Sequence, residues 1–297
     1  MLNSYFLQGT VNTLFGGNKI STKRLENGNT SIDNLEFSYP LRFIQLKSSS
    51  STHAIVCAQS FGGGLVSGDA YHIEINVSDS TNLSYITQSS TKVFKKRSNN
   101  KKTNLHSIFP KADIIQSLHT RIGSGSFFCL LPEPTTCFAD SSFEQYQTFS
   151  CDKTASLVIL DWITCGRKSR NEVWMFERYA SRNIIEYDEI GTVYRDGLLL
   201  ENDVMKFKDR LEPYFCYATL VCYGERIGPL HTLLTDEFQK LTIIKNTLPD
   251  LIWSVSSIKD SKGCVFRGAS KQVHEMKDFL TRLLEPLKGI IGENPFY

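Results

Sequence analysis

The chain has 297 residues, of which 41% are hydrophobic, enough to bury a core in one large domain or two small ones. Its 33 basic and 31 acidic residues give a formal net charge of +2, so charge provides no drive toward nucleic acid or an anionic membrane. No apolar run approaches the roughly 20 residues of a membrane-spanning helix, and no secretory signal is recognisable at the start. We therefore expect a cytoplasmic globular protein that binds neither nucleic acid nor membrane.

The first three quarters of the chain have the pattern of short β-strands. Residues 71–77 alternate apolar and polar side chains, residues 79–82 form a turn signal, and residues 83–87 are extended again. Similar short strands are expected at Ile108 and at residues 114–115, 127–128 and 157–160. Many short strands of this kind are typical of a sandwich, a barrel or a β-solenoid. The unbroken apolar run at residues 215–222 indicates a strand buried on both faces.

Two α-helices are expected toward the C-terminus. Pro229 can occupy the first turn of one, and apolar residues follow at helical spacing as far as Ile244. Ser270 can cap the other, whose apolar stripe ends near Pro286. Such stripes either pack against the sheet or dock a partner. Because composition shows no sharp break, residues 1–297 are expected to form one domain.

Two polar stretches are expected to be exposed loops. Residues 48–52 are serines and a threonine, which are too polar to pack in a core. Residues 92–102 form a basic loop with lysines at both ends. A basic run of this length is either a solvated loop, a nuclear address or a site for an acidic partner.

A glycine-rich segment at residues 61–69 is the first candidate site. It contains Gly62, Gly63, Gly64 and Gly68, which indicates backbone with positive φ or a close approach to another part of the chain. Asp69 stands where a phosphate-binding loop would have lysine, so nucleotide binding is not expected. The segment is either a tight connection between strands or a bend that presents Asp69 to a cation or a partner.

Histidines and cysteines do not form a recognisable metal site. His53 and Cys57 are four residues apart on an expected strand, a span of about 13 Å that one ion cannot bridge. His72 and Glu74 share a strand face, either as solvated side chains or as ligands that converge on one ion. None of the eight cysteines lies in a Cys-x-x-Cys pair, so we expect buried thiols.

A single acid, Asp161, follows four aliphatic residues. A buried carboxylate needs a cation, hydrogen bonds or a raised pKa. Arg167 and Arg170 are nearby candidates to pair with it, and a role in a cation path is the alternative. The sequence has neither Gly-x-Ser-x-Gly nor His-Glu-x-x-His, so we expect that the protein is not an enzyme.

Several segments in fixed order resemble the UreD (also called UreH) family of urease accessory proteins. The glycine-rich segment, residues 62–69, resembles the family's glycine signature, and residues 87–94 resemble the phrase that follows it. Residues 131–139, 160–167 and 195–202 are similar to further blocks, and the closing helix fits as well. The resemblance covers residues 39–295, and residues 1–38 look specific to this chain.

The resemblance implies a fold of stacked short strands, β-helix-like or solenoid-like, with a couple of α-helices. It implies a non-catalytic scaffold or metallochaperone that serves nickel insertion into apo-urease. Its implied partners are apo-urease, a UreF-type protein and, through UreF, a UreG-type GTPase, with homodimeric assembly of the complex as an option. No cofactor is expected to bind tightly, and nickel(II) is expected as transient cargo that crosses an internal passage.

A carrier must release its ion, so isolated carboxylates suit this role better than a Cys/His cluster. The predicted passage residues are Asp69, Asp161, Glu201 and, as a neutral oxygen ligand, Thr91. Predicted partner-binding residues are the four glycines of the glycine-rich segment together with Phe279 and Leu283 of the last helix. A β-solenoid or sandwich module that binds carbohydrate or protein, with no metal role, is the alternative function.

Overall fold

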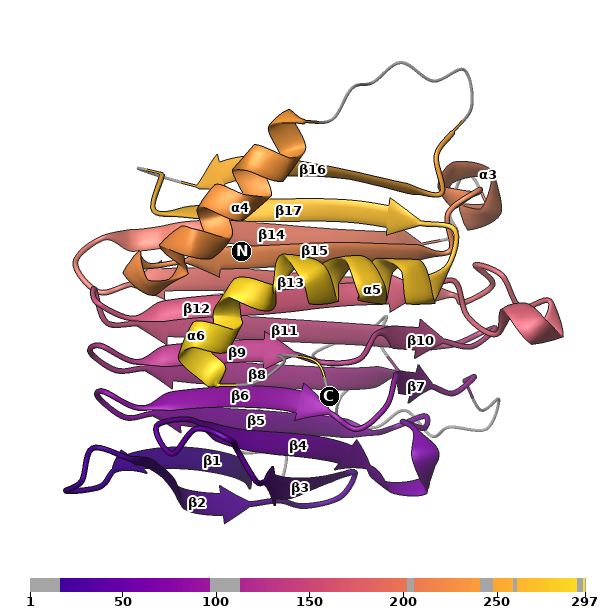
Figure 1. The fold of residues 1–297 in the computed structure, drawn as a ribbon. Coiled ribbons are helices and arrows are strands. Elements are labelled where there is room, and N and C mark those ends of the chain that lie inside the picture. Colours follow the sequence, from indigo (N-terminus) through magenta and orange to yellow (C-terminus); the bar gives the residue numbers. More distant parts are fainter. Residues whose placement is uncertain are drawn as a thin grey trace.

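The protein is built of two β-sheets that pack face to face, with helices over the outer face of the larger sheet (Figure 1). The computed structural model describes residues 17–96, 113–201, 206–240, 248–258, 261–292 and 296. The predicted mainly-β character is confirmed. The strand expected at Ile108 and the helical residues 241–244 lie outside the described residues.

The smaller sheet has seven strands in the order β14-β13-β11-β8-β5-β1-β2. Their bounds are β1 Gly17–Arg24, β2 Thr30–Glu36, β5 Ala70–Val77, β8 Ile114–Ile122, β11 Ser142–Cys151, β13 Arg178–Tyr187 and β14 Gly191–Glu201. Strands β1 and β2 belong to the stretch that looked specific to this chain, and β1 pairs in parallel with β5. Within this stretch, β1 and β2 are therefore part of the sheet.

The larger sheet has ten strands, eight of them in the order β16-β17-β15-β12-β9-β6-β4-β3, with β7 and β10 alongside. Their bounds are β3 Leu41–Leu46, β4 Ala54–Ser60, β6 Asn82–Thr87, β7 Thr91–Val93, β9 Phe127–Leu131, β10 Thr135–Cys137, β12 Ser156–Thr164, β15 Cys216–Tyr223, β16 Leu251–Ile258 and β17 Gly263–Ser270.

The chain passes back and forth between the sheets from β4 to β13. Strands β5, β8, β11 and β13 pair in parallel in the smaller sheet, and β4, β6, β9 and β12 pair in parallel in the larger one. Parallel neighbours need a crossover, and here a strand of the opposite sheet lies in each crossover. Because side chains alternate along each strand, equivalent positions of neighbouring strands form rows across each sheet.

The larger sheet is buried on both faces, which explains its long apolar runs. In β12, Leu157 and Ile159 face the smaller sheet, whereas Val158 and Leu160 face the helices. Strand β15 is covered in the same way, as the unbroken apolar run at residues 215–222 predicted.

Helices α4 (Gly228–Gln239), α5 (Val273–Leu283) and α6 (Lys288–Ile291) lie over the larger sheet (Figure 1). Proline lies in the first turn of α4, as predicted. Ser270 precedes α5, and its Oγ accepts a hydrogen bond from the amide of Gln272 at 3.0 Å. The second helix ends earlier than expected, because Pro286 lies in the separate turn Glu285–Leu287. A short helix that was not expected, α3, spans Phe207–Leu211.

Within the described ranges, the helices are all too short or too polar to cross a bilayer.

Candidate functional site

A row of polar side chains crosses the inner face of the seven-stranded sheet. Tyr71 of β5 is in register with Gln116 of β8, Gln116 with Gln145 of β11, and Gln145 with Ser181 of β13. These positions alternate with outward ones, so all four side chains lie between the sheets. The Tyr71 hydroxyl donates to Gln116 Oε1 at 2.6 Å. The space between the sheets therefore contains polar groups where an apolar core would be the rule.

The ten-stranded sheet contributes a carboxylate opposite this row. Asp161 of β12 is in register with Thr219 of β15, which is in register with Arg267 of β17. Arg267 Nη2 lies 3.4 Å from the carboxylate of Asp196 on β14. This ion pair connects the two sheets near the edge strand β14 of the smaller sheet. Asp161, Thr219 and Arg267 thus form a polar row on the ten-stranded sheet, which faces the polar row of the seven-stranded sheet.

Asp161 accepts hydrogen bonds from four side chains of the opposite sheet. Gln145 Nε2 donates at 2.9 Å and the Tyr179 hydroxyl at 3.2 Å to one oxygen. Asn183 Nδ2 donates at 2.9 Å to the other oxygen, which the Ser181 hydroxyl also contacts. All four donors are neutral, and burial together with the nearby carboxylate raises the pKa of Tyr179 well above its usual value. The carboxylate is therefore held by dipoles, and within the described residues no cationic side chain forms an ion pair with it.

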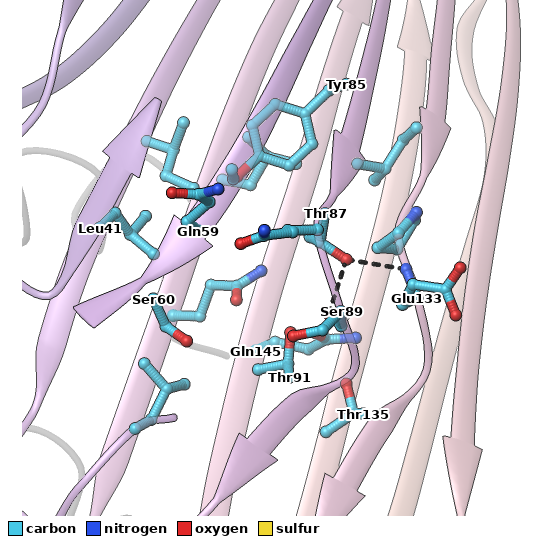
Figure 2. Close-up of a pocket in the computed structure, with 18 of the residues that line it drawn as sticks. Leu41, Gln59, Ser60, Tyr85, Thr87, Ser89, Thr91, Glu133, Thr135 and Gln145 are labelled. Atoms are coloured by element: carbon cyan, nitrogen blue, oxygen red, sulfur yellow. Dashed lines mark hydrogen bonds between the residues drawn. The ribbon is translucent and has the colours of Figure 1, made fainter. Parts of the chain in front are cut away.

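Two cavities share Asp161 as a wall. One has a volume of about 140 Å³ and is bordered by Thr87, Thr91 and Thr135 as well as Gln145. Figure 2 shows this pocket with Leu41, Gln59 and Ser60 on one side and Thr135 and Glu133 on the other. The other cavity, of about 220 Å³, is bordered by Ser181, Asn183, Asp196 and Arg267. Asp161 therefore lies where two cavities meet whose walls combine polar and apolar groups.

Asn183 points to what these spaces can hold. The residue is 6% exposed and borders the larger of the two cavities, and its Oδ1 atom has no hydrogen-bond partner among the residues that the structure describes. A buried acceptor of this kind is normally satisfied by water or an ion. Asp161 and Thr219 border the same cavity, so their oxygen atoms and Asn183 Oδ1 face a space that suits water or a weakly held hydrated cation.

Neither predicted arginine partner of Asp161 is among its hydrogen-bond donors. Arg167 Nε donates to Glu172 at 2.8 Å, and the Arg167 side chain lies 4.0 Å from the ring centre of Phe138. Asp161 faces the smaller sheet from within β12, whereas the chain leaves β12 after Thr164, so Arg167 lies beyond the sheet. The pairing expected from nearness in sequence is therefore wrong, because the strand direction separates the two side chains.

The glycine-rich segment is a tight bend against β7. Gly62, Gly63 and Gly68 have φ values of 66°, 77° and 91°, which favour glycine. At Gly64 a Cβ atom would lie 2.5 Å from the Phe94 ring and 2.6 Å from a backbone oxygen, so this position requires close approach. Both predicted reasons for the glycines are thus present. Gly63 also borders the smaller cavity.

Asp69 closes this bend and borders neither cavity. It is 7% exposed, and its Oδ2 accepts a hydrogen bond from the amide of Val66 at 2.8 Å. Asp113 also stabilises this bend, because its backbone oxygen accepts a hydrogen bond from the amide of Gly68 at 3.0 Å. Asp69 thus stabilises the glycine-rich bend, and its predicted role in the passage remains a prediction.

Glu201 lies at the end of β14 in a nearly buried ion-pair network. Arg178 contacts the carboxylate of Glu201 and also that of Glu144, the latter at 2.8 Å. The side chains of Arg178 and Glu201 are 12% and 14% exposed. Glu201 borders neither cavity and is neutralised by a cation already, so only Thr91 and Asp161 of the predicted passage residues meet at one space.

The predicted docking residues of α5 are used for internal packing. Leu283 is 4% exposed in the core beneath the helices. The ring of Phe279 lies 5.2 Å from that of Trp253 and 5.9 Å from that of Phe266. The apolar stripe therefore covers the sheet, the first of the two options that its spacing left open, and Leu283 has almost no surface left for a partner.

The histidines and cysteines do not assemble into a metal centre within the described residues. Burial lowers the pKa of His72 to about 4, and its neighbour Glu74 lies 3.7 Å from Lys19. All eight cysteines are buried free thiols, as predicted. Burial raises the pKa of Cys137 to about 12, which disfavours the thiolate that a metal would need.

Sequence reasoning missed the donors around Asp161. Gln145 and Gln147 occupy inward positions between Phe143 and Phe149, so the alternation of β11 carried a usable signal. Polar residues at positions that the pattern assigns to the core predict a polar interior. The pairing of Gln145 and Asn183 with Asp161 depends on how the two sheets face each other.

The chain matches the family model described as UreD urease accessory protein over residues 18–296. It is 28% identical over 282 residues to urease accessory protein D of Arabidopsis thaliana, covering 87% of this chain and 92% of that protein. It is 29% identical to urease accessory protein 4 of Cryptococcus neoformans var. grubii, covering 86% of each. Urease accessory protein D of Oryza sativa subsp. indica is 31% identical over 70% of this chain and 65% of its own length. The match begins earlier than residue 39 and takes in β1 and β2. Because the family model matches most of the chain and these three relatives are all urease accessory proteins, the chain belongs to the UreD family of urease accessory proteins.

Proposed function

We propose that this protein is a non-catalytic scaffold for nickel insertion into urease, with nickel(II) as transient cargo. Family membership supports the link to urease. The observation that carries the nickel part is Asp161, a carboxylate held by four neutral donors at the junction of two cavities. A single carboxylate that borders two cavities would attract a divalent cation without enclosing it.

A weak site is what transfer requires. Each additional 1.4 kcal/mol of affinity slows release about tenfold when the association rate is fixed. Thiolate and imidazole cages hold nickel tightly, and the described part of the chain has no group of three or more candidate ligands. A carboxylate with hydroxyl, amide and water oxygens would hold the same ion for a shorter time.

The proposed passage runs between the two sheets. The alternation of β4 to β13 between the sheets supports a β-helix-like stack, in which rows of equivalent inward side chains extend from coil to coil. Thr91 borders the smaller cavity, Asp161 borders both, and Asn183 borders the larger one. An ion that moved along this row would exchange one set of oxygen ligands for the next. Asp69 and Glu201 border neither cavity, so they could bind the ion only at another point of its path.

The assembly follows from the same proposal. The scaffold would bind apo-urease and a UreF-type protein, reach the UreG-type GTPase through UreF, and work in the cytoplasm, with nuclear entry as a second option. Homodimerisation of the whole complex is compatible with this arrangement. The scaffold needs no tightly bound cofactor and catalyses no reaction.

The test is to remove the charge of Asp161 and measure nickel in urease. Asp161→Asn keeps the size of the side chain but removes its negative charge. In cells that express the urease system at limiting nickel, we expect about tenfold less nickel per urease active site, with partial recovery in excess nickel. Nickel content is measured by mass spectrometry and activity by ammonia release.

Asp188→Asn is the matched control. Asp188 is a carboxylate 49% exposed on the surface, where it pairs with Arg121 at 3.2 Å. This variant should load urease normally, and both variants should still assemble with their partners. Normal nickel content with Asp161→Asn, in a complex of unchanged composition, would contradict the proposed passage.

A further inference from the structure

A groove of about 530 Å³ lies where β12 ends and α5 begins. Its walls come from the bend between β6 and β7, the segment that leads into β10, the end of β12 and the first turns of α5. Gly166 and Phe215 form part of its floor, and residues 88–90 form one rim. The groove is thus built from five separate segments of the chain.

The groove is basic. Lys168, Lys271 and Lys277 border it, against one acidic residue, Glu133. Lys277 contacts Glu133, and Lys271 lies 3.0 Å from the exposed Asp250. Among the described residues Lys168 has no carboxylate partner, and its Nζ lies 3.9 Å from the ring centre of Phe215. One lysine is therefore unneutralised and presented over an aromatic floor.

The first turn of α5 adds to this positive character. The helix has 11 residues and begins at Val273 without a side chain that caps its amides. Its dipole places partial positive charge at this end, between Lys271 and Lys277. The helix end and the lysines therefore favour the same kind of ligand, one that carries carboxylates.

The groove continues into the polar interior. Gln88, Ser89 and Glu133 border both the groove and the smaller cavity that reaches Asp161. Thr87, which precedes them, accepts a hydrogen bond from the amide of Glu133 at 2.8 Å and so fixes this shared wall (Figure 2). A ligand in the groove would therefore lie at an opening of the space between the sheets.

We propose that this groove docks an acidic, extended segment of a partner protein at the opening of the polar interior. The inference rests on the proposed function for its role in nickel transfer, but the binding itself does not. The net positive charge of this opening, which comes from Lys168, disfavours entry of a free divalent cation. A docked segment would neutralise this charge and bring carboxylate oxygens to Gln88 and Ser89, so that entry of the ion would depend on the partner being in place.

The binding test uses the purified protein and a fluorescein-labelled peptide of eight glutamates. We expect saturable binding that weakens as sodium chloride rises from 50 to 500 mM. Lys168→Ala combined with Lys271→Ala should weaken binding about tenfold. Lys153→Ala is the matched control, because Lys153 is an exposed lysine at the opposite end of β12 that pairs with the carboxylate of Glu189, as Lys271 pairs with that of Asp250.

Equal weakening by Lys153→Ala, or no saturable binding to the unaltered protein, would overturn the proposal. Melting temperatures of the variants establish that they are folded, which is expected because both substituted lysines lie at the surface. The docking proposal and the nickel-passage proposal are tested by different experiments, so either one can be refuted while the other stands. If Asp161→Asn loads urease normally while the double lysine variant loses the peptide, the passage is refuted and the docking groove stands.

Discussion

The two faces of the ten-stranded sheet both carry apolar cores, but the face toward the smaller sheet also contains a polar patch around Asp161. On the helix-covered face, Val158, Leu160 and Trp162 of β12 pack among aliphatic, aromatic and thiol side chains. On the other face the same strand presents Asp161, and the opposite sheet adds amides and hydroxyls around it. Neighbouring residues of one strand therefore face two different places: the core beneath the helices and the polar patch between the sheets.

This difference separates stability from function. An apolar core with helices on its outside holds the sheet together through burial. The polar patch around Asp161 does not need to add stability, because the apolar cores between the sheets and beneath the helices already provide it. Substitutions on the two faces should therefore have different consequences, and this contrast can be tested directly.

The largest effect is expected in the helix-covered core. Leu280 of α5 is fully buried there, and Leu280→Ala would leave a cavity. We expect a loss of about 2–5 kcal/mol in the free energy of unfolding, measured by urea denaturation. Asp278→Ala, on the exposed side of the same helix, should stay within about 0.5 kcal/mol. A loss below about 1 kcal/mol for Leu280→Ala would show that this face is loosely packed.

A matched pair of exchanges compares the two faces with the same chemistry. Val158→Thr places a hydroxyl in the helix-covered core and should cost about 1–3 kcal/mol in the free energy of unfolding. Thr219→Val removes a hydroxyl from the wall of the larger cavity and should change it by less than about 0.5 kcal/mol. Urea unfolding of both variants gives the comparison. Equal costs would mean that the two faces do not differ in polarity as described.

Much of the fold could be predicted from the sequence because its strands follow local rules. The alternation at residues 71–77 appears as β5, and the unbroken run at residues 215–222 appears as β15, which is buried on both faces. The distribution of strands between two sheets could not be predicted, because parallel pairing joins residues far apart in the chain. Tyr71 and Gln116 are neighbours in the sheet although 45 residues separate them.

The candidate site was only partly predictable for the same reason. Asp161 stood out because a carboxylate follows four aliphatic residues. Its donors Gln145 and Asn183 come from other strands, and nearness in sequence suggested Arg167 instead, which pairs with Glu172. Asp69 and Glu201 were chosen by similar local reasoning, and the structure places both outside the cavities. Local pattern identifies a buried charge, whereas its partners depend on the packing of the two sheets.

The smallest effect is expected in thiol reactivity. Cys165 belongs to the core between the sheets, borders the basic groove and has a pKa raised to about 11 by burial. Cys216 belongs to the helix-covered core, and burial raises its pKa to about 12. At pH 8 a thiol with a pKa near 11 is thiolate in only about one molecule in a thousand, so both should react slowly with iodoacetamide. Peptide mass spectrometry should find Cys165 modified before Cys216, and both modified rapidly once urea unfolds the chain. Modification of Cys216 at the same rate as Cys165 in the folded protein would mean that solvent reaches both interiors equally, which would remove the contrast between the two faces.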